Sequence, residues 1–215
     1  MVDTDRHAAR FVESREGGGR FEIVEPIGRG GQGQTFLARR VDSGERVALK
    51  RLALRLVDNW KAVELFEREG RVLRNLEHPQ IPAFVDSFVV DAETGPRFYL
   101  AQEYVDGETL ADQLEAGVRW NEAEAVDFLE SMTGVLGHLA SLRPPIVHRD
   151  IKPANIVERS SGGWALVDFG AVQAIMPAEV GGSTVVGTTG YVPAEQGTPE
   201  MKEKPWPRSS PFTLP

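Results

Sequence analysis

Cysteine is absent from the sequence, which excludes disulfide bonds, thiolate metal sites and a cysteine nucleophile. No apolar run approaches the roughly 18 residues that a membrane-spanning helix needs, and the polar N-terminus lacks the apolar centre of a signal peptide. Basic residues are also scarce, since 24 Lys and Arg stand against 32 Asp and Glu and the formal net charge is -8. We therefore expect a cytoplasmic protein whose main partners include neither nucleic acid nor a membrane.

The first 52 residues divide into a polar leader and a strand-rich segment. Residues 1–20 are polar and end close to three consecutive glycines, so we expect a flexible leader there. From Phe21 onward, short apolar runs alternate with glycine and with the turn Asp42-Ser43-Gly44, which predicts an antiparallel meander. With 215 residues, of which 41% are hydrophobic, the chain is long enough for a sizeable core in one or two domains.

The clearest chemistry lies between positions 147 and 170, which read VHRDIKPANIVERSSGGWALVDFG. Phosphoryl transfer needs a carboxylate near the attacking hydroxyl, oxygen ligands for Mg²⁺ and cations for the developing charge. Asp150 fits the first need, and Lys152 can neutralise the transferring group. Asn155 and Asp168 offer the hard oxygen atoms that Mg²⁺ takes as ligands. The stretch therefore points to phosphoryl transfer.

At these positions the chain resembles the eukaryotic-like (Hanks-type) serine/threonine protein kinases. The motif H-R-D-I-K-P-x-N, followed 18 residues after Asp150 by the Asp of D-F-G, is highly specific. Lys152, two residues after Asp150, resembles the Ser/Thr rather than the Tyr kinases. The resemblance implies an α+β fold with a five-stranded antiparallel N-lobe, one main helix and a mostly helical C-lobe. It also implies the cofactors ATP and Mg²⁺, a protein substrate with Ser or Thr hydroxyls, and catalytic roles for Asp150, Lys152, Lys50 and Glu69.

A glycine motif, G-x-G-x-x-G, is formed by Gly28, Gly30 and Gly33. Missing side chains let backbone N–H groups approach phosphate oxygens. A dinucleotide-binding site would need a helix after the glycines, whereas residues 35–39 have the pattern of a strand, which favours the kinase version. Taken alone, the motif is weak, and ordinary hairpin turn chemistry is the alternative for the three glycines.

The resemblance also implies the residues around the nucleotide. Gln102 would stand beside the adenine pocket as gatekeeper, and the backbone of Glu103 and Val105 would hydrogen-bond the adenine edge. Val157 would form the floor, and Thr35 would make the ceiling slightly more polar than the family's usual Val. The nucleotide-binding residues implied in this way are Ile27, Gly28, Gly30, Gly33, Thr35, Ala48, Lys50, Gln102, Glu103, Val105 and Val157.

Lys50 and Glu69 form a second candidate pair. Lys50 ends an apolar strand, where a lysine is usually a solvated edge charge. In residues 60–78, an apolar stripe of helical spacing contains Glu69, and a carboxylate on a buried face should be paired. The resemblance implies that Glu69 pairs with Lys50, which then reaches the α- and β-phosphates; a surface position for Glu69 is the alternative. Gly70 lowers the helix propensity at this point, so we expect a mobile helix.

Helical patterns also follow the second pair of strand-like runs in residues 81–105. Residues 109–116 predict a short helix, and Asn121 is the expected N-cap of a longer helix that reaches Leu142. The apolar face of this helix requires a packing partner. We interpret His7, His78 and His138 as structural residues rather than metal ligands, because no second ligand is suitably spaced with any of them.

Residues 171–195 are rich in Gly, Ser and Thr and suit an activation segment. A phosphate on this segment could be bound by Arg149, which would order the loop; ordinary loop hydroxyls are the alternative. The candidate phosphorylation sites are Ser183, Thr184, Thr188 and Thr189.

The resemblance extends from Phe21 to about Gln196. The family's A-P-E motif is altered to Pro193-Ala194-Glu195, and the following residues hold five prolines without helical periodicity. We therefore expect a leader over 1–20, an N-lobe over 21–105, a partial, C-terminally truncated C-lobe over 106–196 and a proline-rich tail over 197–215. From this division we expect weak or absent kinase activity and a partner that covers the incomplete C-lobe. A non-catalytic nucleotide-binding or regulatory module, and a product frame-shifted after Gln196, are the alternatives.

Overall fold

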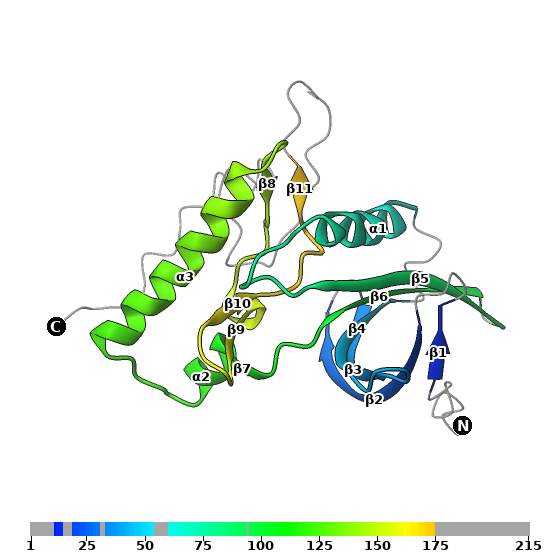
Figure 1. The fold of residues 1–215 in the computed structure, drawn as a ribbon, viewed down its shortest axis with the longest axis horizontal. Coiled ribbons are helices and arrows are strands. Elements are labelled where there is room, and N and C mark those ends of the chain that lie inside the picture. Colours follow the sequence, from blue (N-terminus) through cyan, green and yellow to red (C-terminus); the bar gives the residue numbers. More distant parts are fainter. Residues whose placement is uncertain (1–10, 15–18, 31–32, 54–59, 94, 175–215) are drawn as a thin grey trace, which may run out of the picture.

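The computed structural model describes residues 11–14, 19–30, 33–53, 60–93 and 95–174. Outside the described residues lie Ser183, Thr184, Thr188, Thr189, the sequence Pro193-Ala194-Glu195 and the tail over 197–215. Within the described part, a strand-rich N-lobe and a helix-rich C-lobe are joined by the segment that follows Glu103 (Figure 1). The predicted α+β class with an antiparallel N-lobe sheet is confirmed.

The N-lobe is one antiparallel sheet with the strand order β1-β2-β3-β4-β6-β5. Apolar side chains from alternate positions gather on one side of the curled sheet, where Phe88 stacks between Phe21 and Tyr99 with ring centroids 5.5 and 5.3 Å apart. The strands are β1 (Phe11–Glu13), β2 (Arg20–Arg29), β3 (Gly33–Arg40), β4 (Arg46–Leu52), β5 (Phe84–Ala92) and β6 (Gly95–Glu103).

Strand β1 makes the sheet one strand larger than the five predicted, and it lies in the segment predicted as a flexible leader. Val12 pairs with Phe21 and is buried in the N-lobe cluster. The guanidinium of Arg20 lies 4.5 Å from the ring centroid of Phe11. Three residues are too few to show an alternating pattern, so this strand depends on pairing with β2 rather than on a local signal.

Helix α1 (Trp60–Arg74) packs on the sheet and has a buried face of Phe66, Glu69, Gly70 and Leu73, as the apolar stripe predicted. Its Gly70 lies against the sheet, because a Cβ atom there would be 3.4 Å from Cβ of Ser87 and 3.5 Å from Leu100. The glycine therefore belongs to the close packing of α1 against β5 and β6.

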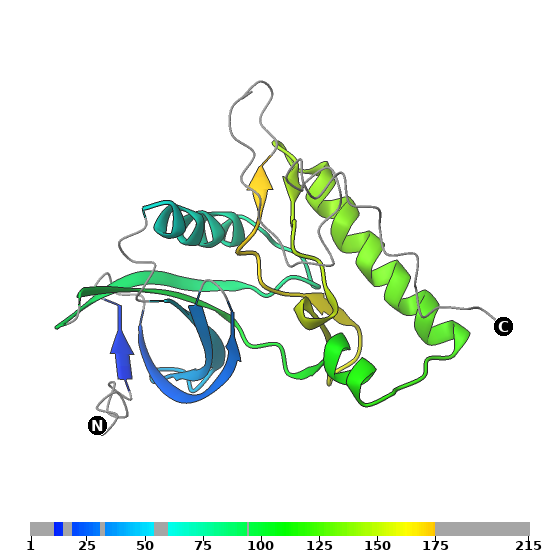
Figure 2. The same ribbon diagram turned by 180° about the vertical axis from the view of Figure 1, so that it is seen from behind.

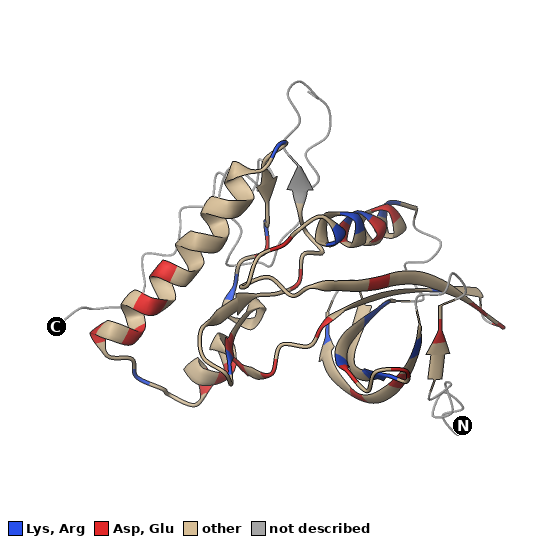
Figure 3. Cartoon of the chain, in the orientation of Figure 1, with Lys and Arg blue, Asp and Glu red and all other residues tan. Residues whose placement is uncertain are grey.

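The C-lobe contains the helices α2 (Leu110–Glu115) and α3 (Glu122–Ser141), with capping boxes that begin at Thr109 and Asn121. The predicted N-cap at Asn121 is confirmed. Acidic residues gather in the N-terminal half of α3, where their negative charges interact favourably with the positive end of the helix dipole (Figure 3). The remaining elements are β7 (Gly107–Thr109), β8 (Ile146–Val147), a 3-10 helix (Pro153–Asn155), β9 (Ile156–Arg159), β10 (Trp164–Leu166) and β11 (Gln173–Ala174).

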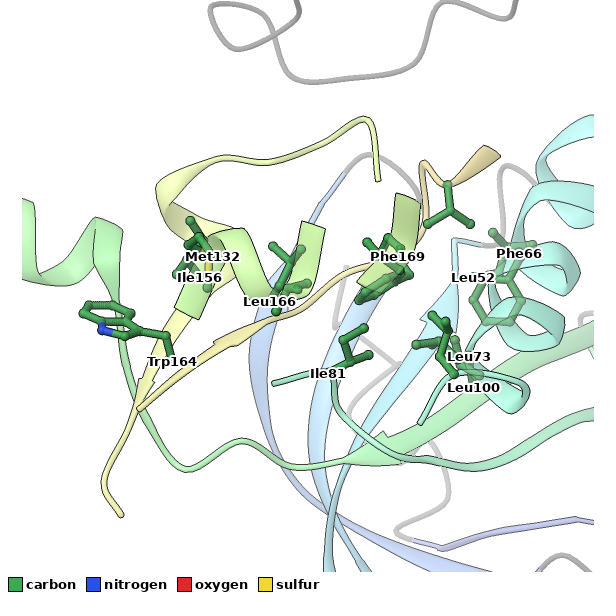
Figure 4. Packing of buried hydrophobic residues seen from close by; sticks show 14 residues of the cluster. Leu52, Phe66, Leu73, Ile81, Leu100, Met132, Ile156, Trp164, Leu166 and Phe169 are labelled. Atoms are coloured by element: carbon green, nitrogen blue, oxygen red, sulfur yellow. The ribbon is translucent and has the colours of Figure 1, made fainter. Parts of the chain in front are cut away.

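One apolar cluster spans both lobes (Figure 4). From the N-lobe it takes Phe66, Leu73 and Leu100, and from the C-lobe it takes Leu166 and Phe169 among others. Because all five side chains are nearly inaccessible, the two lobes share a continuous core at their junction.

Helix α3 lies along the outer side of the C-lobe, away from the large sheet (Figure 2). Met132, Val135 and Leu139 are its buried residues, whereas Val126, Leu129 and Leu136 are exposed by 47%, 59% and 40%. This confirms the expectation that apolar surface on this helix faces water. In the described part of the chain, neither α3 nor any other helix is long and apolar enough to cross a membrane.

Candidate active site

A cavity of about 600 Å³ lies between the lobes. Every nucleotide-binding residue implied by the resemblance lines it except Gly33, and so do Glu69, Lys152, Asn155 and Asp168. Asp150 does not line the cavity, but its carboxylate is bonded to two residues that do. The fold thus brings four separate segments of the sequence to one cavity.

Lys50 connects the upper and lower walls of this cavity. Its Nζ donates to both carboxylate oxygens of Glu69, at 3.0 and 2.8 Å, and to Oδ1 of Asp168 at 2.7 Å. The predicted ion pair between Lys50 and Glu69 is therefore present, and the side chain of Glu69 is only 1% exposed. Strand β4, helix α1 and the segment after β10 each supply one member.

Lys50, Glu69 and Asp168 shift one another's pKa values. Burial alone would lower the pKa of Lys50, but the carboxylates of Glu69 and Asp168 outweigh it and raise this pKa. Burial raises the pKa of Glu69, and the charge of Lys50 opposes that rise. The Lys50 ammonium lowers the pKa of Asp168 to about 2. At neutral pH the site therefore holds a lysine cation and an ionised Asp168.

The catalytic-loop residues form a compact hydrogen-bonded group. Lys152 Nζ donates to Oδ2 of Asp150 at 2.8 Å, and Asn155 Nδ2 donates to the same oxygen at 3.0 Å and to the Asp150 carbonyl at 2.8 Å. The 3-10 helix that starts at Pro153 bends the backbone so that Asn155 can reach back to Asp150. These bonds fix the orientation of the Asp150 carboxylate.

The backbone around this group contains two strained residues. Arg149 and Asp168 have φ angles of 67° and 62°, in the left-handed region that side chains disfavour. His148, which precedes Arg149 in the sequence, is buried, and its ring lies edge-on to Phe169 at 4.7 Å between centroids. Burial lowers the pKa of His148 to about 4, so this histidine is neutral at physiological pH.

The glycine motif divides into two different roles in the structure. Gly28 and Gly30 line the cavity, and the N–H of Gly30 donates to the carbonyl of Gly33 at 2.9 Å. A Cβ atom at Gly33 would instead overlap the carbonyl oxygen of Arg51 on β4. Strand packing is therefore sufficient to explain glycine at position 33, while its contact with phosphate stays a prediction.

The segment predicted to bind adenine closes the back of the cavity. Gln102, Glu103 and Val105 all line it. The N–H of Glu103 already donates to the carbonyl of Ala83 at 2.8 Å, so a contact from this residue to adenine would have to use its carbonyl oxygen. Val105 and Val157 pack in one small apolar cluster, which suits the flat faces of a base.

The donor set at the lower wall fits a magnesium ion. Mg²⁺ is usually held by one or two protein oxygens together with phosphate oxygens of the substrate. Asp168 supplies an ionised carboxylate, and the two bonds from Nδ2 of Asn155 turn its amide oxygen away from Asp150. No cluster of three or more acidic, His or Cys ligands occurs among the described residues. A bound Mg²⁺ would take its other ligands from phosphates and water.

Arg149, the predicted phosphate-binding residue, lies near a second cation. Burial lowers the pKa of Arg149, and the charge of Arg68 on α1 lowers it further. Two arginines from different lobes thus face the same region. The hydroxyl residues that would present a phosphate to them lie outside the described residues.

The sequence matches the family described as protein kinase domain over residues 21–204. The chain belongs to the protein kinase family. Serine/threonine-protein kinase D from Synechocystis is 38% identical over 194 residues, and serine/threonine-protein kinase PknA from Nostoc is 35% identical over 193 residues. Serine/threonine-protein kinase PrkC from Bacillus subtilis is 30% identical over 179 residues. These alignments cover 82–83% of this chain but 27–36% of the relatives, so it spans about a third of the length of the curated kinases it matches.

The kinase cavity also contains residues that sequence reasoning did not find. Thr109 and Asp112 line its far end, and they are the two members of the capping box of α2. Their S/T-x-x-D spacing is a helix signal, which gave no reason to expect a cavity. The other lining residues missed are Arg29, Tyr104, Gly107, Ala111, Ala154 and Val167.

Proposed function

We propose that this kinase chain transfers the γ-phosphoryl group of ATP to Ser or Thr hydroxyls of a protein substrate, with Mg²⁺ as cofactor. The observation that carries the proposal is the contact of Lys50 with both Glu69 and Asp168. A phosphate-binding lysine must be held by one carboxylate and lie beside the metal-binding one. The proposal extends to ATP, Mg²⁺ and cytoplasmic location, which family membership alone leaves open.

Each role follows from the position of the residue. Asp150 is the proposed acceptor of the hydroxyl proton, because its carboxylate is held by Lys152 and Asn155 at hydrogen-bond distance. Lys152 also offers a positive charge to the transferring group. Asn155 and Asp168 are the proposed metal ligands, and a bound Mg²⁺ would neutralise phosphate charge.

The proposed nucleotide position follows from the shape of the cavity. Lys50 at its inner end is the proposed partner of the phosphates, and the apolar surfaces of Ala48 and Val157 are the proposed contacts of the base. Gly28 and Gly30 in the roof lack side chains, which leaves room for backbone contact with phosphate oxygens. We retain the expectation that the 215-residue chain alone has weak or absent activity.

The test is phosphoryl transfer from labelled ATP to a basic protein substrate, with ATP affinity measured in parallel. Lys50→Met should lower the transfer rate by about 100-fold or more, since a pre-positioned cation contributes on that order to phosphoryl-transfer rates. Chelation of Mg²⁺ should abolish transfer. ATP binding with no transfer by the wild-type chain would favour the non-catalytic module, and absence of ATP binding would contradict the proposal.

A further inference from the structure

Arg159, at the end of β9 in the C-lobe, contacts two separate segments of the N-lobe. Its Nη1 donates to Oε1 of Glu103 at 2.6 Å, and its Nη2 donates to the carbonyl of Pro79 at 3.2 Å. Glu103 ends β6, whereas Pro79 lies in the loop between α1 and β5. The side chain of Arg159 is 17% exposed and that of Glu103 is 35% exposed, so this ion pair is partly shielded from water.

Glu103 is held at three points by these neighbours. Besides the bond from Arg159, its Oε2 accepts from the N–H of Ala83 at 3.2 Å, and its own N–H donates to the carbonyl of Ala83 at 2.8 Å. The loop that precedes β5 is therefore tied to the end of β6 by both backbone and side chain. Because Glu103 lines the cavity, this arrangement fixes backbone that faces the proposed adenine position.

A second ion pair at the junction of the lobes is more exposed to water. Arg46 on β4 donates to Oδ2 of Asp106 at 2.9 Å, but the two side chains are 47% and 53% exposed. Exposed pairs of this kind contribute little, since water screens them and two flexible side chains must be ordered. The junction of the lobes thus contains one partly shielded ion pair and one more exposed pair.

We propose that Arg159 is a positioning residue for nucleotide binding: through Glu103 and Pro79 it holds the segment between the lobes in the conformation that receives adenine. This inference rests on the proposed function, because it assigns the nucleotide to the cavity between the lobes. The guanidinium is suited to the task, since its planar fork can donate to a carboxylate and a carbonyl in two directions at once. A lysine could make either contact but not both in the same geometry.

The test compares Arg159→Gln, Arg159→Lys, Glu103→Gln and the double variant Arg159→Gln/Glu103→Gln with the wild-type chain, and Arg46→Gln is the matched control. Affinity for Mg-ATP is measured by titration, and backbone hydrogen exchange is measured without ligand. Arg159→Gln should weaken Mg-ATP binding about tenfold, with a smaller loss in Arg159→Lys. Because the two residues act as one unit, the double variant should lose no more than Arg159→Gln alone.

Hydrogen exchange separates local positioning from general stability. In Arg159→Gln, the amides of Ala83 and Glu103 should exchange faster while those of β2 to β4 stay unchanged, and Arg46→Gln should behave like wild type. Faster exchange throughout the N-lobe, or wild-type exchange and affinity in Arg159→Gln, would overturn the inference. A wild-type chain that binds no ATP would contradict the proposed function, and the exchange comparison would still decide whether Arg159 holds this segment.

Discussion

At the scale of single residues, the site depends on groups that are charged or neutral because of where they are buried. Lys50 and Asp168 keep their charges through mutual contact, whereas His148 has no carboxylate hydrogen-bonded to it in the described part of the chain and is neutral. For Lys50 the neighbouring carboxylates outweigh the effect of burial, whereas for His148 burial outweighs the charges of Asp168 and Asp150. This difference gives a pH dependence that can be measured.

Burial lowers the pKa of His148 from its usual value of 6.5 to about 4, so the unfolded chain binds a proton in this range that the folded chain does not. Above pH 6.5 the titration of His148 does not change the free energy of unfolding. As the pH falls from 6.5 to 4, this titration should lower the free energy of unfolding by about 3 kcal/mol. Asp168, with a pKa of about 2, contributes only at lower pH. His148→Phe should flatten the profile from urea unfolding, and parallel profiles for the two proteins would contradict this.

The two roles of the glycine motif predict different effects of the same substitution. Gly33→Ala should lower the free energy of unfolding by at least about 2 kcal/mol, because the new Cβ atom would overlap the backbone of β4. Gly30→Ala is the control, since no atom of the described residues lies within 4 Å of a Cβ atom there, and it should change stability by less than about 0.5 kcal/mol. Equal losses in thermal or urea unfolding would show that β4 does not restrict position 33.

At the scale of elements, helix α1 carries Glu69 to Lys50, and Gly70 lies on the face of the helix that packs on the sheet. The sequence predicted a mobile helix from this glycine. That expectation stays a prediction; in the structure the glycine lies in the packing contact with the sheet, where a Cβ atom at 3.4 Å from Ser87 would be in ordinary contact rather than overlap. An alanine should therefore fit without moving α1.

Gly70→Ala should raise the free energy of unfolding by about 0.5 to 1 kcal/mol, because alanine is the better helix former and the available space accepts a methyl group. Gly137→Ala on α3, where nothing lies within 4 Å, measures the gain from helix propensity alone. A loss of stability in Gly70→Ala alongside a gain in Gly137→Ala would indicate that α1 needs the close approach to Ser87.

The elements also show how far the sequence could predict the fold. The alternating apolar runs, the stripe on α1 and the cap at Asn121 are local signals, and the corresponding elements are present. Strand β1 has only three residues and is stabilised by pairing with β2, so no local sequence pattern predicts it. The ion pair between Lys50 and Glu69 was predictable because a buried carboxylate requires a partner. The contacts of Arg159 were not, since they join residues 56 and 80 positions apart through folding alone.

At the scale of the whole molecule, the cavity lies where the two lobes meet over a shared apolar core. Phe169 belongs to that core, and Asp168 beside it reaches Lys50 in the other lobe. Packing between the lobes and the position of the proposed metal ligand are therefore linked through adjacent residues. Helix α3, which carries exposed apolar residues, lies on the side of the C-lobe away from the N-lobe sheet (Figure 1).

The most direct test of the central claim is the rate at which the purified chain transfers phosphate from Mg-ATP to Ser or Thr in a protein substrate, compared with Asp150→Asn. Asparagine keeps the size of the side chain but cannot accept the hydroxyl proton, so the variant should bind ATP normally and transfer phosphate about 100-fold more slowly or worse. A wild-type chain that binds Mg-ATP and transfers nothing would favour the non-catalytic module, and measurable transfer at equal rates in the two proteins would contradict the assignment of this site as the catalytic centre of a kinase.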